Sequence, residues 1–312
     1  MHEVQLPANH NERMKRVLCA IEGLSVGDAF GERLFSNPSI LEHVEAAYQA
    51  KTPPKPFTDD TLMALSIVSI LRQYGYIQQD QLARSFAQRY DPRRGYGPAM
   101  HQLLRALQSG LPWKDGASNQ FEGQGSYGNG AAMRVAPVGA YFAGSMEEVV
   151  IQAARSAEVT HTHPEGVAGA IAVAVATAHA WSLRDEAQLP TRSEFIDLVL
   201  PFVPTSELRR KLRLARDISE KTALDAVVAM LGNGSLVSAQ DTVPFTLWCA
   251  GEHLGDYKQA ILLTASAGGD VDTTCAIVGG IVVLATGVEG IPEAWRQVRE
   301  PLPDWPFQEQ AE

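Results

Sequence analysis

Two short acidic clusters lie near opposite ends of this chain, and each stands directly before a long apolar run. The first is Thr58-Asp59-Asp60-Thr61 and the second is Asp270-Val271-Asp272-Thr273-Thr274. A chain of 312 residues is long enough for about two domains. If the two clusters meet in space, however, they tie both ends of the sequence together. We therefore expect a single domain over residues 1–312.

Helix capping explains either cluster taken alone about as well as metal binding does. Thr and Asp are common N-cap residues, and the helix dipole favours acidic side chains in a first turn. A cap needs only one acceptor, whereas Asp59 next to Asp60, and Asp270 close to Asp272, force like charges together. Because this costly arrangement occurs twice, it indicates a cation. Gly268 and Gly269 would let the backbone turn tightly before the second helix.

The side chains of both clusters offer hard oxygen donors, which suit Mg²⁺ or Mn²⁺ rather than zinc or copper. Adjacent helical residues point about 100° apart, so Asp59 and Asp60 can contact two neighbouring ions. Asp272 and Thr273, supported by Asp270, would close the other side. The pattern predicts a hydrolytic site with two divalent ions.

Apolar residues recur at three- and four-residue steps along nearly the whole chain, which predicts an all-α fold. Helices are expected near residues 14–24, 62–71, 100–107, 147–156, 165–181, 194–200, 207–218, 223–231, 244–250, 257–267 and 273–284. Pro98, Pro137 and Pro244 suit first-turn positions, and Gly232-Asn233-Gly234 suits a helix stop. Segments 33–57, 90–98 and 111–129 carry few helical signals and are candidates for ligand-contacting loops.

Charge and composition favour a cytoplasmic protein that binds neither nucleic acid nor membranes. The net charge is −10 and the pI is about 5.3, which leaves no basic field for phosphate backbones or anionic lipid. The start of the chain is polar, unlike a secretory signal. The most apolar stretch, residues 167–181, is shorter than the roughly 20 residues that cross a bilayer. Isolated Cys19, Cys249 and Cys275 are expected to be buried and reduced.

Two further segments could contact a ligand. Gly125-Ser126-Tyr127-Gly128-Asn129-Gly130 could bring backbone N–H groups to an anion, with a helix starting near Ala131 behind it. A plain loop is the alternative. In Thr160-His161-Thr162-His163-Pro164-Glu165, the two histidines lack a third soft ligand for zinc, so hydrogen bonding to a ligand or capping of the next helix is favoured.

Taken together, these motifs resemble the ADP-ribosylglycohydrolase family, whose members include the dinitrogenase-reductase-activating glycohydrolase. The matching stretches run in family order over about 250 residues: Gly27-Asp28-Ala29-Phe30-Gly31, Phe57 to Met63, Ser126 to Pro137, Thr160 to Glu165 and Gly268 to Thr274. The combined aspartate clusters are the most specific part of the resemblance.

The resemblance implies a compact orthogonal helical bundle with a binuclear centre of two Mg²⁺ (or Mn²⁺). The metal ligands it implies are Thr58, Asp59, Asp60, Asp270, Asp272 and Thr273. It places Ser126, Tyr127, Gly128, Asn129, Gly130 and His161 at the ADP-ribose, whereas Met133 and Arg134 are interpreted as structural. Asp59 or Asp272 would act as the catalytic base. Asp91 is a further catalytic candidate, with a solvated turn aspartate as its alternative.

One departure from the family pattern bears on the substrate. Family members that act on ADP-ribosyl-serine place a glutamate where this chain has Phe35. Glu32 lies nearby and is considered only as a substitute. The mismatch favours arginine linkages and leaves the general acid unidentified.

The resulting hypothesis is a hydrolase that cleaves the bond between ADP-ribose and a protein side chain, most readily arginine. Its partner would be an ADP-ribosylated protein or a small molecule containing ADP-ribose. The alternatives are an ADP-ribosyl-serine or O-acetyl-ADP-ribose hydrolase, a non-catalytic ADP-ribose-binding protein, and a structural all-α protein. The oligomeric state is left open.

Overall fold

The computed structural model describes residues 6–36, 38–44 and 54–308, and within them the regular structure is helical, with two isolated β-bridges. The all-α prediction is confirmed. The longer helices are α1 (His10–Ser36), α3 (Asp59–Tyr74), α4 (Gln79–Arg89), α5 (Pro98–Gln108), α8 (Ala136–Phe142), α9 (Met146–Glu158), α10 (Pro164–Ser182), α11 (Arg192–Val199), α12 (Glu207–Asp217), α13 (Leu224–Leu231), α14 (Ala239–Glu252), α15 (Tyr257–Ser266) and α16 (Val271–Thr286). Shorter elements are η1 (Pro38–His43), α6 (Trp113–Ser118), α7 (Gln120–Gly123), η2 (Asn129–Ala131), η3 (Leu200–Phe202), η4 (Val288–Gly290) and α17 (Glu293–Val298).

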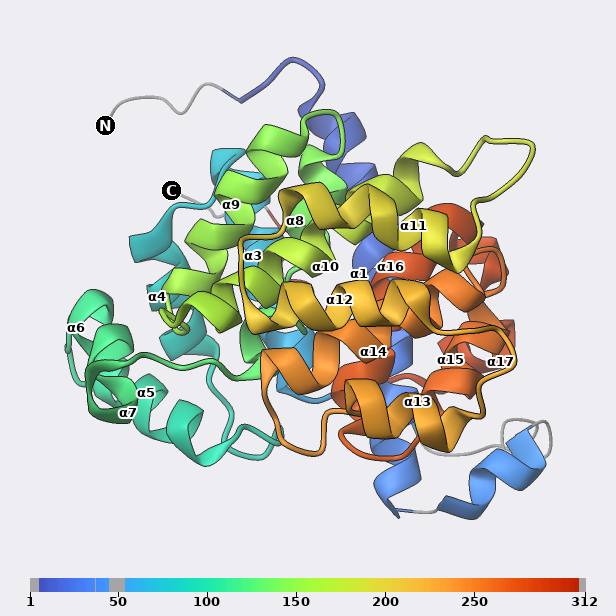
Figure 1. The fold of residues 1–312 in the computed structure, drawn as a ribbon. Coiled ribbons are helices and arrows are strands. Elements are labelled where there is room, and N and C mark those ends of the chain that lie inside the picture. The colour runs from blue at the N-terminus through green and yellow to red at the C-terminus, as the bar shows by residue number, and fades with distance from the viewer. Residues whose placement is uncertain (1–5, 37, 45–53, 309–312) are drawn as a thin grey trace.

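The first long helix and the last long helix lie side by side in the middle of the molecule, where Figure 1 shows α1 next to α16. A row of glycines on α1, Gly23, Gly27 and Gly31, makes this approach close. A Cβ atom at any of the three would collide with the α16 backbone. The Tyr257 hydroxyl of α15 also donates a hydrogen bond to the Gly23 carbonyl, at 2.6 Å. The two ends of the sequence are thereby packed backbone against backbone.

The apolar core is one connected cluster of buried side chains that draws on helices from α1 to α17. Helix α10 lies within it and packs against α8, α9, α14 and α16, so the prediction of a buried core helix is confirmed. Its small side chains allow four neighbours to approach it. Among the described residues, no helix is both long and apolar enough to span a bilayer. The expected single domain over residues 1–312 stays a prediction.

Two expected helix starts were wrong. The helix expected near Ala131 is only the 3-10 turn η2, and α8 begins at Ala136. Pro137 explains the shift, because a proline without an N–H is best tolerated in the first turn. Pro244 lies inside α14, which begins earlier, at Ala239. Pro98 does stand at the start of α5, and Gly232 does end α13.

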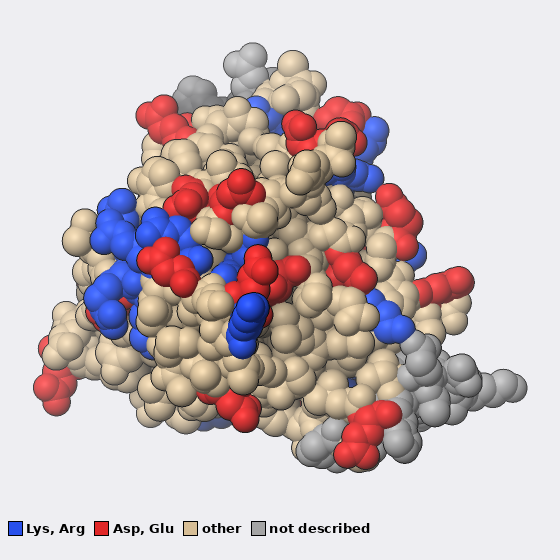
Figure 2. Space-filling view, turned by 45° about the vertical axis from the view of Figure 1, so that its right-hand side comes forward, with Lys and Arg blue, Asp and Glu red and all other residues tan. Residues whose placement is uncertain are grey.

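The segments that showed few helical signals differ in structure. Residues 90–98 form a loop, whereas 111–129 contain the short helices α6 and α7, which Figure 1 places at one edge of the molecule beside α5. Segment 33–57 holds the end of α1 and η1, and its residues 37 and 45–53 lie outside the described part of the chain. The three cysteines are buried and free, as expected. On the face drawn in Figure 2, acidic and basic side chains lie among one another.

Candidate metal centre and ligand site

The two acidic clusters meet where the first turns of α3 and α16 face each other. The Thr273 hydroxyl donates to the Asp60 carboxylate, at 3.3 Å from Oδ1 and 3.4 Å from Oδ2, across a sequence separation of 213 residues. All the threonines and aspartates involved are buried or half-buried. The structure therefore brings together the two helix starts that carry the six predicted metal ligands.

The start of α3 is held by Asp28 of α1. Its carboxylate accepts hydrogen bonds from the Thr58 and Thr61 backbone N–H groups, at 3.0–3.1 Å, and from the Thr61 hydroxyl, at 2.5 Å. The Thr58 hydroxyl caps α3 by accepting from the Asp60 N–H at 3.3 Å, and it donates to the Asp60 carboxylate at 2.9 Å. Asp28 thus fixes the turn that presents Asp59 and Asp60.

The second cluster is positioned by the turn before α16 and by the glycine-rich segment. Gly268 and Gly269 have φ of 63° and 78°, which side chains disfavour, so the predicted tight turn is present. The Asp270 N–H donates to the Asn233 carbonyl at 3.2 Å. The Asn129 side-chain amide donates to the Asp270 carboxylate at 2.7 Å and to the Thr242 hydroxyl at 3.1 Å. Asn129 therefore links the predicted ligand loop to a predicted metal ligand.

Burial of several carboxyl groups in one place raises their pKa values. Burial, followed by the charge of Asp28, raises the pKa of Asp59 to about 8. The pKa of Asp28 rises to about 6, because burial outweighs the hydrogen bonds it accepts. Burial and neighbouring aspartates also raise the pKa of Asp60 and of Asp272 well above the ordinary value. These four carboxyl groups resist ionisation together, so a bound cation would stabilise their charged forms.

The donor set fits hard divalent ions. Asp272 Oδ1 is enclosed and has no hydrogen-bond partner, which is the state expected of an oxygen reserved for a metal. Within the described residues, no three His, Cys, Asp or Glu side chains are grouped so that they could hold a metal ion as they stand. Thr58 and Thr273 contribute hydroxyl oxygens to the same place. Ligation here would combine carboxylates with threonine hydroxyls.

The other catalytic candidates lie in different surroundings. Asp91 sits in an exposed turn, where Arg93 Nε and Nη2 each donate to its carboxylate at 2.9 Å and hold its pKa to about 2. That pairing supports the turn interpretation. The same loop reaches the site through its backbone, because the Arg94 carbonyl accepts from the Asp59 N–H at 2.7 Å. Phe35 is exposed, whereas Glu32 is half-buried and burial raises its pKa.

The glycine-rich segment forms a compact loop beside the acidic clusters. The Ser126 hydroxyl accepts from the Gly128 N–H at 3.2 Å. Gly128 pairs with Ser238 in an isolated β-bridge, and the Tyr127 carbonyl accepts from the Ala239 N–H at 2.9 Å. The predicted contact segment is thus fastened to the start of α14, and Asn129 links it to Asp270.

Aromatic side chains border this loop. The exposed rings of Phe121 and Tyr127 stack with centroids 6.2 Å apart, and Tyr127 meets His163 edge-on at 5.3 Å. Phe121, Glu122 and Val237 adopt positive φ, a strained conformation for residues with a side chain that is often retained at functional sites. His163 caps α10 by accepting from the Glu165 N–H, in agreement with the capping alternative.

His161 faces the same loop from the other side. A Cβ atom at Gly128 or Gly130 would come within 3.2 Å of its Nε2 atom. Its Nδ1 atom lies 2.7 Å from the Thr160 hydroxyl, which also accepts from buried Arg134. Burial and the Arg134 charge lower the pKa of His161 to about 3. The imidazole is therefore neutral.

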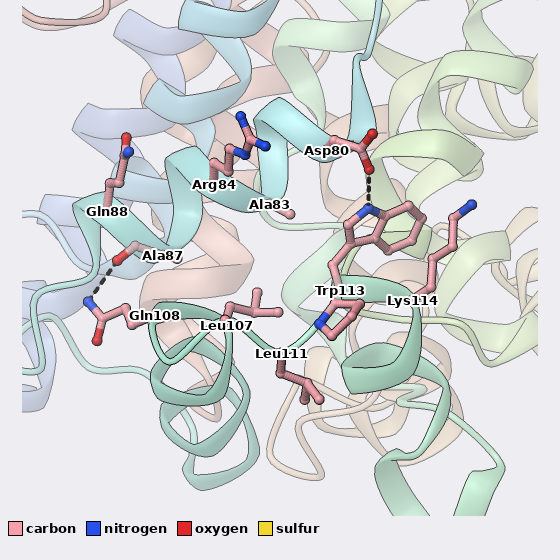
Figure 3. Close-up of a pocket in the computed structure, with 12 residues that line it drawn as sticks. Asp80, Ala83, Arg84, Ala87, Gln88, Leu107, Gln108, Leu111, Trp113 and Lys114 are labelled. Atoms are coloured by element: carbon pink, nitrogen blue, oxygen red, sulfur yellow. Dashed lines mark hydrogen bonds between the residues drawn. The ribbon is translucent and has the colours of Figure 1, made fainter.

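A separate pocket of about 900 Å³ lies between α4, α5 and α6, and none of its lining residues belongs to the predicted site. Figure 3 shows Trp113 and Leu111 on one side and Asp80 and Arg84 on α4 on the other. The Trp113 indole N–H donates to Asp80 at 2.7 Å. This pocket is distinct from the acidic clusters.

Sequence reasoning assigned no role to Asp28 or Thr160, and none to Asn129 as a partner of Asp270. Asp28 stands within a stretch that matches the family, but its bonds to Thr58 and Thr61 depend on how α1 and α3 pack. Arg134 is completely buried, and its interpretation as structural stays a prediction. These contacts become apparent only in the folded structure.

Comparison with known proteins gives consistent results. The family model for ADP-ribosylglycohydrolase matches residues 9–310. The mouse protein ADP-ribosylhydrolase ARH3 is 29% identical, over 89% of this chain and 85% of its own length. Its counterpart in Xenopus tropicalis is 32% identical, over 80% of this chain and 78% of its own length. A solved structure described as an ADP-ribosylglycohydrolase-related protein complex aligns with a TM-score of 0.63 and 25% identity, over 93% of this chain and 94% of its own.

Proposed function

The chain belongs to the ADP-ribosylglycohydrolase family, and on that premise we propose that it hydrolyses the glycosidic bond between ADP-ribose and a protein side chain in a metal-dependent reaction. The observation that carries the proposal is the meeting of Asp60 and Thr273, which brings both acidic clusters to one site. That site lies next to a glycine-rich loop with an aromatic border, which is a suitable arrangement for a nucleotide diphosphate.

The proposed cofactors are two Mg²⁺ (or Mn²⁺). Thr58, Asp59, Asp60, Asp270, Asp272 and Thr273 would hold them. When bound, divalent ions polarise oxygen atoms and help to position hydroxyl groups of a substrate. Their charge would also relieve the repulsion among the buried carboxylates.

The protein's own groups supply the remaining chemistry. Asp59 or Asp272 would accept a proton from the attacking water, as a general base. The surrounding carboxylates would ease the positive charge that builds on the ribose in the transition state. Burial of these carboxylates limits contact with bulk water. It therefore strengthens both the proton transfer and the stabilisation of positive charge. Asp91 is the weakest of the three catalytic candidates, because its carboxylate is committed to Arg93.

The ADP-ribose would lie along Ser126, Tyr127, Gly128, Asn129 and Gly130, with His161 beneath the loop. A side chain at Gly128 or Gly130 would crowd His161, because an added Cβ atom would lie within 3.2 Å of its ring. The exposed Tyr127 ring, 42% accessible, offers a surface on which a base can stack.

The ADP-ribose is proposed to be linked to arginine, because this chain has Phe35 where the family members that act on ADP-ribosyl-serine have a glutamate. ADP-ribosyl-serine and O-acetyl-ADP-ribose are the competing substrates. Half-buried Glu32 lies one turn beyond Asp28 on α1 and is considered as a substitute for the missing glutamate. We further propose a cytoplasmic location, where such modified proteins would be encountered.

The test is release of ADP-ribose from peptides carrying ADP-ribosyl-arginine or ADP-ribosyl-serine, and from O-acetyl-ADP-ribose, with Mg²⁺, with Mn²⁺ and with a chelator. Asp59→Asn and Asp272→Asn should each abolish turnover. Asp197→Asn, on the surface beside Arg216, is the matched control and should leave turnover unchanged. Asp91→Asn and Glu32→Gln examine the remaining candidates.

Each result has a distinct meaning. Release that persists in the chelator, or in both site variants, rules out the metal-dependent mechanism. Tight metal-dependent binding of ADP-ribose with no product selects a binding protein instead. Faster release from serine than from arginine overturns the linkage assignment while leaving the hydrolase intact.

A further inference from the structure

A buried chain of polar groups runs from Arg134 to the glycine-rich loop. Arg134 Nη2 donates to the Thr160 hydroxyl at 2.7 Å and to the Ser156 carbonyl at 3.0 Å. The Thr160 hydroxyl lies 2.7 Å from His161 Nδ1. Arg134, Thr160 and His161 are all buried, at 0%, 0% and 3% exposure.

The guanidinium itself is fixed in the core. It lies 4.6 Å over the Phe86 ring, and its Nη1 atom points at the Met63 sulfur, 3.7 Å away. Burial lowers the pKa of Arg134 to about 9, which still leaves the group charged at neutral pH. A buried charge is costly, so its placement beside Thr160 calls for an explanation.

The donor and acceptor inventory determines the direction of each hydrogen bond. A guanidinium can only donate, so the Thr160 oxygen must accept from Arg134. Among the described residues, the hydroxyl has one other partner, His161 Nδ1. The hydroxyl proton therefore goes to Nδ1, which accepts it. A neutral imidazole that accepts at Nδ1 carries its own proton on Nε2.

The Nε2 edge of the ring is the one that faces the loop, next to Gly128 and Gly130. The hydrogen bonds of the His161 side chain use only Nδ1, so the Nε2 proton is available to a ligand. A glycine at both positions keeps side chains out of the space in front of that nitrogen.

We propose that Arg134 is a positioning residue that acts through the Thr160 hydroxyl to hold His161 as the neutral Nε2–H tautomer, so that this nitrogen donates to an oxygen of ADP-ribose at the glycine-rich loop. The identity of the ligand rests on the proposed function, whereas the tautomer of His161 does not. Arg134 therefore has a role beyond packing.

The tautomer can be read directly by ¹⁵N NMR of histidine-labelled protein, with His161→Gln used to assign the signal. Wild type should show a protonated Nε2 and an unprotonated Nδ1. Thr160→Val should yield a mixture of tautomers, and Thr160→Ser, which keeps the hydroxyl, should restore the wild-type spectrum. Thr162→Val is the matched control, because that neighbouring hydroxyl donates to the Ala117 carbonyl and does not touch His161.

Arg134 is tested in the same spectra. Arg134→Met should release the Thr160 hydroxyl and mix the tautomers, whereas Arg134→Lys keeps a donor and should preserve Nε2–H. If Arg134→Met fails to fold, the Thr160 pair still decides the matter, since both of its members keep the buried arginine.

Binding of ADP-ribose with Mg²⁺ supplies a second readout in the form of a double-mutant cycle. Thr160→Val should weaken binding by roughly three- to tenfold in the presence of His161, the loss expected of one neutral hydrogen bond. In the His161→Gln background it should have no further effect, because the substituted amide presents its own N–H donor without help from Thr160. A purely structural role for Thr160 would weaken binding equally in both backgrounds.

Two results overturn the proposal: a wild-type spectrum with the proton on Nδ1, or equal losses of affinity in the two backgrounds. Failure of the wild-type protein to bind ADP-ribose would refute the proposed function and the ligand-donor role of Nε2. The spectra would still decide whether Arg134 and Thr160 set the tautomer.

Discussion

Gly31 of α1 lies directly against Asp272 of α16, because a Cβ atom at Gly31 would come within 2.5 Å of the Asp272 Cα atom. One of the proposed metal ligands thus rests on the backbone of the first helix. Asp28, one turn earlier on the same helix, holds the start of α3. A single face of α1 therefore aligns both acidic clusters.

Gly31→Ala should disturb the site without altering any ligand. The added methyl group must push α16 away, which should cost about 1–3 kcal/mol of unfolding free energy, as overpacking of a core does. It should also raise the Mg²⁺ concentration needed for half-maximal activity. Gly97→Ala is the matched control, because a Cβ atom at Gly97 meets nothing within 4 Å. Equal behaviour of the two variants would show that the contact does not position Asp272.

Asp60→Asn should separate metal binding from folding. In the metal-free protein the substitution removes a buried charge that its neighbours oppose, so we expect a higher melting temperature than that of wild type at pH 8. Wild type should gain about 2.7 kcal/mol for each Mg²⁺ bound at 100 times the Kd of its site, and the variant should gain none. Calorimetry with and without Mg²⁺ measures both effects. A variant that Mg²⁺ still stabilises fully would remove Asp60 from the ligand set.

The stability of the metal-free protein should fall as the pH rises from about 4 to above 8. The folded-state pKa values of Asp28, about 6, and Asp59, about 8, exceed the unfolded value near 3.9. Between these limits the folded state binds more protons than the unfolded chain, so each group lowers stability by up to about 1.4 kcal/mol per pH unit. Urea unfolding in a chelator tests this, and Asp59→Asn should flatten the slope. Stability that increases over the same range would contradict the assignment.

Asn129→Ala should weaken metal binding although Asn129 is not itself a proposed ligand. It removes the amide that donates to Asp270 at 2.7 Å, and loss of such a supporting partner costs about 10- to 100-fold in metal affinity. Thr242→Val removes only the other partner of Asn129, so it should have a smaller effect. Titration with Mn²⁺, followed by its paramagnetic signal, gives both dissociation constants. The reverse order of effects would indicate that Asn129 acts through α14 instead.

The sequence was sufficient to predict the all-α fold, because helical spacing is a local signal, and it gave a reason to expect that the two clusters meet. Regular apolar spacing indicated the helices. The repeated like charges at Asp59-Asp60 and Asp270-Asp272 indicated that a cation binds there. Helix starts were less predictable where proline was the only cue. Pro137 begins a helix and Pro244 lies inside one, although neither differs visibly in its local pattern.

The supporting contacts were not predictable, because they join residues whose partners are set by tertiary packing. Asp28 reads as one aspartate in a helix until α3 is placed against it. Arg134 reads as an ordinary basic residue until its burial next to Thr160 and His161 is known. Sequence spacing carries no information about either pairing, which requires the helices to be assembled first.

The glycine row on α1 also has a consequence for how the protein is made. Its counterpart, α16, follows α1 by more than 200 residues, so a growing chain carries an unfilled backbone groove on α1 until those residues have been made. Until α16 is made, the acidic centre also lacks Asp270 and Asp272. Any product that stops short of residue 270 would expose this groove and would be an evident target for chaperones and proteases.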